Sequence, residues 1–192
     1  MDALTRVEQT RSWLLPGADK DRQSVTAEWN PVGRTLIHGV DLRESRSVAK
    51  RSGLVTELYR ADWFAAGAVV GQVFVVRLHP GGVSAWHAHE RTIDRLTVVI
   101  GAATVVLFDA RAESPTRGLV NEFHLDEHRP MTIVVPPQVW HGVQNAAGVT
   151  CLVANLPDEP YRYDDPDHWR VPPDSPHVPY TFQARSGVSE AI

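Results

Sequence analysis

The sequence predicts an all-β protein, built as an antiparallel sandwich or barrel. Short runs rich in Val, Ile, Leu and Thr recur along the 192 residues. Fourteen prolines and thirteen glycines punctuate these runs, and little helical periodicity is present. Many short strands separated by turn signals are typical of sandwiches and barrels. The expected strands are RTLIHGV (34–40), LVTELYR (54–60), VVGQVFVVRL (69–78), RLTVVIG (95–101), ATVVLFD (103–109), MTIVVP (131–136) and VTCLVANL (149–156).

The chain is expected to form one domain, 1–192, because its length supports a hydrophobic core without staples. The runs place the barrel core at 34–157, after a short N-terminal segment in which only 1–25 offers a short helix. Residues 158–185 are too rich in proline for regular structure and too aromatic to be simply disordered. We therefore expect an extended strap that packs against the barrel. Its acidic stretch DEPYRYDDPDHWR is either a solvated flap or a lid over the barrel mouth.

The composition indicates a globular protein that works on small molecules. A net charge of −4 gives no electrostatic footprint for nucleic acid or for an anionic membrane surface. The single cysteine, Cys151, lies in an apolar run, and a lone cysteine forms no intrachain disulfide, which fits a reducing compartment. No segment has the pattern of a signal peptide or of a membrane span. We expect a cytoplasmic protein.

The stretch AWHAHERTID places two histidines, His87 and His89, two residues apart on a strand. Successive side chains of a strand point to opposite faces, so both imidazoles project from the same face. A metal ion and a buried proton-transfer site are the two uses of such a pair, and the pattern alone leaves both open. The other histidines, including His168, are expected on the surface or in loops.

The spacing of these histidines extends into a longer pattern that resembles the two motifs of the cupin family. The first half consists of Gly81, His87, His89, Asp94 and Gly101, and the second half of Pro136, His141 and Asn145. The resemblance implies a double-stranded β-helix, or jelly-roll barrel. It also implies one divalent metal, Fe, Mn, Zn or Ni, inside the barrel, held by His87, His89, Asp94 and His141. A metal-free barrel that binds its ligand by hydrogen bonds is the alternative.

From about Thr35 onward the chain resembles the dTDP-4-dehydrorhamnose 3,5-epimerases, which are dimeric cupin-fold enzymes of deoxysugar biosynthesis. Segments such as GLVTELYRADW, GGVSAWHAH and IVVPPQVWHGVQN carry the resemblance, and Asp109-x-Arg111-x-x-SPT-x-Gly118 is its most specific element. The resemblance implies a homodimer and a sugar or sugar-nucleotide substrate. The family's base removes protons next to the C4 ketone, and it corresponds to His87. The expected substrate contacts are Gln72, which matches a family glutamine, Ser84 and Asn145, whereas Arg111 either pairs with Asp109 or reaches the barrel mouth to contact substrate.

Several positions depart from that family in one direction. Ser84 stands where the family has an arginine, Asp94 where it has a lysine, and Val153 or Ala154 where it has its general-acid tyrosine. These changes favour a pocket that binds a cation. A ligated His87 is not free to act as a base, so another group has to move the proton. The candidates are Glu90, Tyr161, Tyr163 and a metal-bound water, and the sequence does not rank them.

The leading hypothesis is a metal-assisted cupin isomerase or epimerase that acts next to a carbonyl of a sugar or similar small molecule. An Fe(II)-dependent oxygenase that uses the same ligands is the second hypothesis. A non-catalytic sugar-binding barrel is the third.

Overall fold

The computed structural model describes residues 13–28, 31–63, 69–145 and 147–182. The chain divides into two units, Met1–Thr35 and Leu36–Ile192. In the first unit the described residues form turns and one isolated bridge between Val25 and Pro31. The sequence predicts a short helix within 1–25, but residues 13–25 contain none. Residues 1–12 lie outside the described part of the chain.

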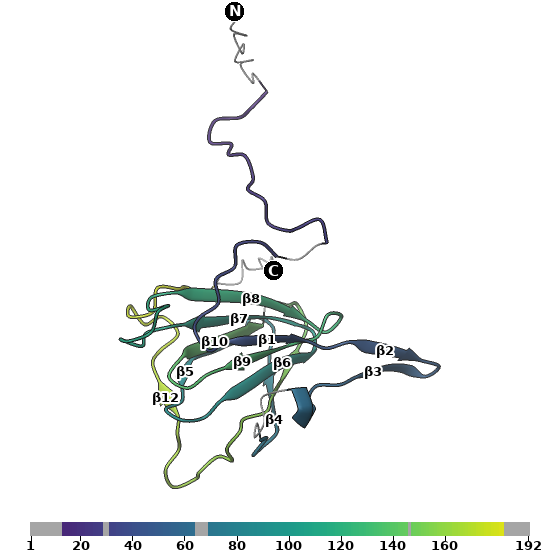
Figure 1. Cartoon of the computed structure of the whole chain (residues 1–192), viewed down its shortest axis with the longest axis vertical. Coiled ribbons are helices and arrows are strands. Elements are labelled where there is room, and N and C mark those ends of the chain that lie inside the picture. Colours follow the sequence, from purple (N-terminus) through teal and green to yellow (C-terminus); the bar gives the residue numbers. More distant parts are fainter. Residues whose placement is uncertain (1–12, 29–30, 64–68, 146, 183–192) are drawn as a thin grey trace, which may run out of the picture. The chain divides into compact units, whose positions relative to one another are not determined.

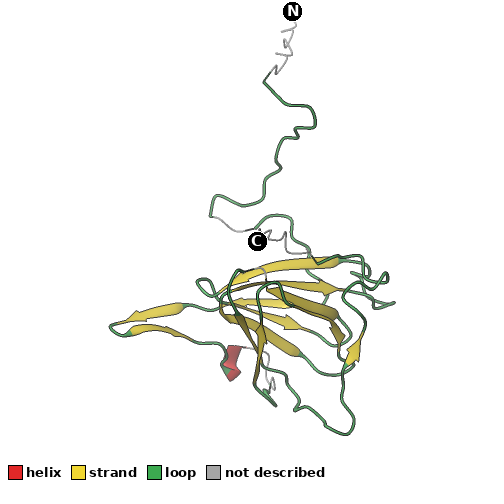
Figure 2. Ribbon diagram, turned by 180° about the vertical axis from the view of Figure 1, so that it is seen from behind, coloured by secondary structure: helices red, strands yellow, loops and turns green. Residues whose placement is uncertain are grey.

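The second unit is built from two five-stranded antiparallel sheets that face each other, as Figures 1 and 2 show. This confirms the predicted jelly roll. The first sheet has the order β1 (Asp41–Glu44), β9 (Met131–Val135), β6 (Asp94–Ile100), β11 (Cys151–Asn155), β4 (Phe74–Leu78). The second has the order β12 (Trp169–Arg170), β5 (Val83–Ala88), β10 (Trp140–Asn145), β7 (Ala102–Phe108), β8 (Val120–Asp126). A separate hairpin joins β2 (Ser47–Lys50) to β3 (Gly53–Thr56), and a short 3-10 helix, η1, covers Ala61–Trp63.

The core lies between the two sheets, and alternating side chains of the strands build it. In β8 the exposed Glu122 and His124 alternate with the buried Asn121, Phe123 and Leu125. The inward residues meet those of the opposite sheet, and each fully buried aliphatic or aromatic side chain contributes roughly 1.5–3 kcal/mol. Within the described residues no helix is long and apolar enough to cross a membrane.

Three of the predicted strands are wrong or too long: 34–40, 54–60 and 69–78. The run 54–60 is strand only as far as Thr56, the end of β3. RTLIHGV at 34–40 is not a strand, because the Ile37 N–H bonds the side chain of Asn121 and the Val40 N–H turns back to the Ile37 carbonyl. The predicted strand 69–78 begins only at Phe74, since the Gly71 N–H donates to the carbonyl of Pro157 and so leaves the strand ladder.

The later part of the proline-rich strap packs against the outside of the second sheet, as expected for an extended segment. Its residues Trp169 and Arg170 form β12 at the edge of that sheet, beside β5. Further on, Tyr180 and Phe182 pack against the fully buried ring of Trp86, with ring centroids 6.1 and 5.0 Å away. The strap therefore has a small hydrophobic core of its own with β5.

Candidate active site

A cavity of about 210 Å³ lies inside the barrel, with walls from both sheets. Apolar side chains such as Val76, Leu96 and Val153 form part of the wall. The strap supplies another part, which includes Tyr161 and His168. The strap thus contributes to the cavity wall, as the lid alternative expects, while much of its acidic stretch is exposed to solvent.

A bulge in β5 turns both Ser84 and His87 toward the cavity. In a regular strand, residues three apart point to opposite faces. The register between β5 and β10 shifts after the pair His87–His141, so two residues of β5 oppose Gly142 alone. A Cβ on Gly142 would lie 2.5 Å from the Cβ of Ala85, which explains why this position holds glycine.

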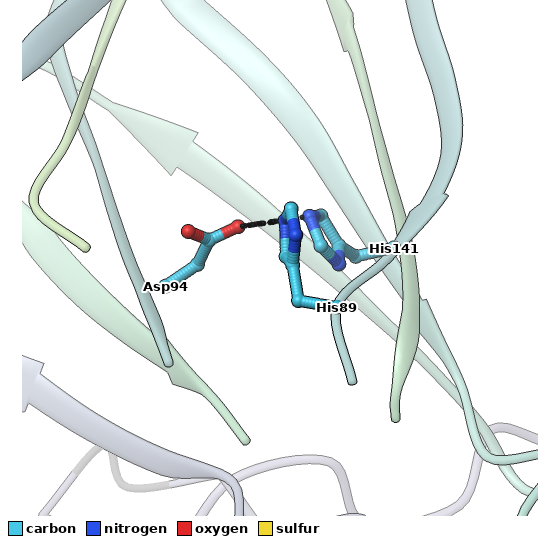
Figure 3. A group of neighbouring side chains, drawn as sticks. All are labelled: His89, Asp94 and His141. Carbon is cyan, nitrogen blue, oxygen red and sulfur yellow. Dashed lines mark ion pairs between the residues drawn. The ribbon is translucent and has the colours of Figure 1, made fainter. Parts of the chain in front are cut away.

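Three of the four predicted metal ligands meet inside the barrel: His89, Asp94 and His141 (Figure 3). The Nε2 atoms of His89 and His141 each lie 3.1 Å from Oδ2 of Asp94. The other carboxylate oxygen, Oδ1, accepts a hydrogen bond of 2.9 Å from Nδ2 of Asn155. We call these three ligand residues the triad. Its ligand atoms lie within 4.8 Å of one another, and Asp94 and His141 are buried.

The backbone fixes which nitrogen of each triad histidine carries a proton. Nδ1 of His89 lies 2.5 Å from the carbonyl oxygen of Asp167, and Nδ1 of His141 lies 3.2 Å from that of Val139. Because a carbonyl oxygen only accepts, each Nδ1 is the donor. In a neutral imidazole the lone pair of Nε2 then points at Oδ2 of Asp94, which is repulsive unless a proton or a metal cation lies between them. Metal-binding histidines have this arrangement, so the triad fits a divalent cation.

Hydrogen bonds within the triad shift the pKa values of Asp94 and His89. Burial raises the pKa of Asp94, but hydrogen bonds from His141 and His89 outweigh it and hold this pKa well below its ordinary value. Burial lowers the pKa of His89, whereas the hydrogen bond and charge of Asp94 raise it by more. Asp94 is therefore ionised, and it favours the protonated form of His89. A divalent cation at this position would compete with that proton.

His87, predicted as the fourth ligand, lies beside the triad and outside it. Its ring centroid is 5.5 Å from that of His141, and its Nε2 lies 3.1 Å from Oγ of Ser84. Its Nδ1 is buried and has no hydrogen-bond partner among the described residues. Burial and the charges of His141 and Arg170 lower the pKa of His87 to about 3, so the imidazole is neutral.

His168, for which the sequence predicts a surface or loop position, lines the cavity. Its ring centroid lies 5.2 Å from that of His87 and 4.9 Å from that of His89. Burial and the charge of Arg170 lower the pKa of His168 to about 4. Only the pairing of β12 with β5 brings this histidine to the site, and no motif spacing in the sequence signals that pairing.

The other predicted site residues divide between the cavity and the rest of the barrel. Gln72, Ser84 and Tyr161 line the cavity, and Oε1 of Gln72 accepts a hydrogen bond of 2.9 Å from the backbone N–H of Tyr161. As far as the chain is described, four of them are not part of the wall: Glu90, Arg111, Asn145 and Tyr163.

Structural contacts hold two of these four, and for Arg111 they are the expected pairing with Asp109. The guanidinium of Arg111 donates to both oxygens of the buried Asp109, 2.8 and 2.9 Å away, inside the SPT turn. Nδ2 of Asn145 donates to the carbonyls of Leu78 and Val149. The hydroxyl-bearing side chain of Tyr163 is 89% exposed, and Glu90 is exposed as well.

A jelly-roll barrel with histidine and carboxylate side chains converging on its interior defines this protein as a cupin. The chain belongs to the dTDP-4-dehydrorhamnose 3,5-epimerase family, whose model matches residues 34–185. It is a sugar epimerase of the dTDP-sugar isomerase type, which confirms the predicted class of enzyme and favours it over the oxygenase and the non-catalytic barrel.

Three relatives show how far the similarity extends. The chain is similar to the "Probable low-salt glycan biosynthesis epimerase Agl13" of Haloferax volcanii, with 34% identity over 139 residues, which cover 72% of this chain and 89% of the relative. It is 28% identical over 147 residues, 77% of this chain and 97% of the other, to the spore coat polysaccharide biosynthesis protein SpsL of Bacillus subtilis. The crystal structure of a dTDP sugar isomerase from Desulfovibrio desulfuricans is 30% identical and superimposes with a TM-score of 0.71, over 76% of this chain and 92% of that one.

Proposed function

We propose that this enzyme epimerises or isomerises a sugar nucleotide by moving a proton on the carbon next to a sugar carbonyl, with His87 as the base. The observation that carries the proposal is the setting of His87. Its imidazole is neutral, Ser84 anchors its Nε2, and its buried Nδ1 has no protein partner among the described residues. His87 lines the sugar-sized cavity, and a neutral imidazole there has one nitrogen lone pair that can take a proton.

In the proposed step His87 takes the proton from the carbon, and the electron pair of the broken C–H bond moves toward the carbonyl oxygen to form an enolate. The developing negative charge beside His87 raises the proton affinity of the ring, which offsets the effect of burial. Ser84 holds the ring in place through its hydrogen bond to Nε2. His87 then gives up its proton to solvent, and a proton delivered to the opposite face of the carbon by water or by Tyr161, which lines the cavity, re-forms the carbonyl and inverts the centre.

We further propose that His89, Asp94 and His141 hold a divalent cation. Two observations support this: the three ligand side chains lie together, and the two Nδ1–H groups donate to backbone carbonyls. Membership of the family gives no support for a bound cation. A bound cation supplies a Lewis acid that stabilises negative charge on the carbonyl oxygen of the substrate. Because Val153 or Ala154 stands where the family has its general-acid tyrosine, the proton for the opposite face has to come from another group, such as Tyr161 or a water molecule. In this proposal His87 is the base, so it is not a ligand.

The size of the cavity supports a sugar ring inside and a nucleotide outside. At about 210 Å³ it is smaller than pockets that enclose a whole drug-sized ligand, roughly 300–1,000 Å³. The family description and the similar Desulfovibrio enzyme both name dTDP sugars. Two exposed arginines of the strap, Arg162 and Arg170, line the wall and offer positive charge to phosphate groups.

We also propose a homodimer, formed through the β2–β3 hairpin. This hairpin extends from the barrel in Figures 1 and 2 and exposes Val48, Leu54 and Val55, which are 52%, 70% and 53% exposed. Exposed apolar side chains gathered on one element favour burial against another chain. Replacement of Leu54 by glutamate is expected to yield monomers in light scattering, and an unchanged mass would contradict the proposal.

The test of the proposed reaction is incorporation of solvent deuterium into dTDP-4-dehydrorhamnose, followed by NMR. Wild-type protein is expected to exchange hydrogens next to the C4 carbonyl. His87→Gln is expected to lose this exchange by 100-fold or more, the order of a general-base contribution, while it still folds. His128→Gln, a change at an exposed histidine, is the matched control and is expected to exchange normally. No exchange by the wild-type protein would overturn the proposal.

A further inference from the structure

The side chain of Asp167, in the strap, holds the turn that follows β5. Its Oδ1 accepts the backbone N–H of Glu90 at 2.6 Å. Its Oδ2 accepts the backbone N–H groups of Arg91 and Thr92 at 2.9 and 3.0 Å and the hydroxyl of Thr92 at 2.9 Å. Burial raises the pKa of Asp167, but the hydrogen bonds from these backbone groups lower it to about 2, so the carboxylate is ionised. One side chain therefore fixes the turn between His89 and Asp94.

The backbone of the same residue holds His89 itself. The carbonyl oxygen of Asp167 accepts the Nδ1–H of His89 at 2.5 Å, and this bond directs the Nε2 lone pair of His89 toward Asp94. The next residue, His168, packs its ring against that of His89. Two separate contacts of Asp167, one through the side chain and one through the main chain, thus converge on one ligand and on the turn that carries it.

We propose that Asp167 is a positioning residue, which couples docking of the strap to cation binding at His89. The inference rests on the proposed cation site. A carboxylate that binds three successive N–H groups sets the path of the turn, and the turn sets where His89 lies relative to Asp94. Because the coupling is reciprocal, a bound cation holds the strap closed, and a detached strap weakens cation binding. No motif in the barrel contains Asp167, which lies 78 residues from His89.

The experiment measures binding of Co²⁺ alone, by the visible absorption of the bound ion, to EDTA-treated wild-type protein and to Asp167→Ala and Asp167→Asn. The expected loss of affinity for Asp167→Ala is about 10- to 100-fold, as for removal of the groups that orient metal ligands. Asp167→Asn keeps one acceptor oxygen, so an intermediate loss is expected. Asp165→Asn removes an exposed carboxylate two residues away and is expected to bind as the wild type does.

A second measurement follows the strap directly. Trypsin cuts after Arg162 and Arg170, both exposed in the strap, and mass spectrometry locates the cuts. Co²⁺ is expected to slow these cuts in the wild type and in Asp165→Asn, and to slow them less in the Asp167 variants. Circular dichroism checks that each variant is folded, and Asp167→Asn carries the test if Asp167→Ala does not fold.

The outcomes separate this inference from the cation proposal. Wild-type affinity for Co²⁺ in folded Asp167 variants, or equal trypsin cleavage with and without Co²⁺ in the wild type, would overturn the coupling and leave the triad as a cation site. No binding of Co²⁺ by the wild type would overturn both.

Discussion

Replacing His87 with glutamine is expected to change how the stability of the cation-free protein depends on pH. The pKa of His87 falls from 6.5 to about 3 in the folded protein, chiefly because the ring is buried. Below pH 6.5 the unfolded chain therefore binds a proton at this residue that the folded protein does not bind, and stability falls as the pH falls. The glutamine variant has no such proton to bind.

The size of the effect follows from the same shift. Between pH 6.5 and pH 5 the unfolded His87 is protonated, whereas the folded one stays neutral. This range spans about 1.5 pH units, and at roughly 1.4 kcal/mol per unit the free energy of unfolding falls by about 2 kcal/mol at pH 5. Urea unfolding of EDTA-treated protein at pH 7.5 and pH 5 measures it. The wild type is expected to lose about 2 kcal/mol more than His87→Gln between these conditions. Equal losses in the two proteins would refute the assignment of His87 as a buried neutral base.

Three further changes test neighbouring parts of the site. Gly142→Ala places a Cβ 2.5 Å from that of Ala85, so we expect a loss of roughly 1–3 kcal/mol in urea unfolding; an unchanged midpoint would contradict the role given to the bulge. Asn155→Leu removes the hydrogen bond to Oδ1 of Asp94 and is expected to weaken Co²⁺ binding about tenfold or more, whereas wild-type affinity would show that Asp94 needs no such support. Tyr163→Phe is expected to leave deuterium exchange unchanged, since the ring is 89% exposed; a tenfold loss would place its hydroxyl at the substrate.

The barrel is predictable from the sequence because its strands carry their own signal. The runs at 95–101 and 103–109 correspond to β6 and β7 within one residue, since apolar β-branched side chains line both faces of these buried strands. RTLIHGV has the same composition but no strand partner. The backbone N–H of Ile37 donates to the side chain of Asn121. The N–H of Val40 donates to the carbonyl of Ile37 and closes a turn in which Gly39 has a φ of 88°. Composition alone does not distinguish these cases.

The candidate site is predictable only in part, because half of it depends on long-range contacts. The spacing of His87 and His89 predicts that they share one face of a strand, whereas Asp94 and His141 are placed with them only by the resemblance to the cupin motifs. Which of them belong to the triad depends on the bulge opposite Gly142 and on the carbonyl of Asp167. His168 lies in the cavity wall because the two-residue strand β12, in a proline-rich segment, pairs with β5. Such contacts leave no periodic pattern in the sequence.

In the proposed site His89, Asp94 and His141 hold a cation, while His87 stays free as the base. Elemental mass spectrometry of protein purified without added metal, for the wild type, Asp94→Asn and His87→Gln, distinguishes these two roles. We predict close to one divalent metal per chain in the wild type and in His87→Gln, and little in Asp94→Asn, with deuterium exchange lost in His87→Gln. Loss of the metal in His87→Gln would make His87 a ligand. Absence of metal from the wild type, persisting after addition of Fe(II), Mn(II) or Zn(II), would contradict the cation site altogether.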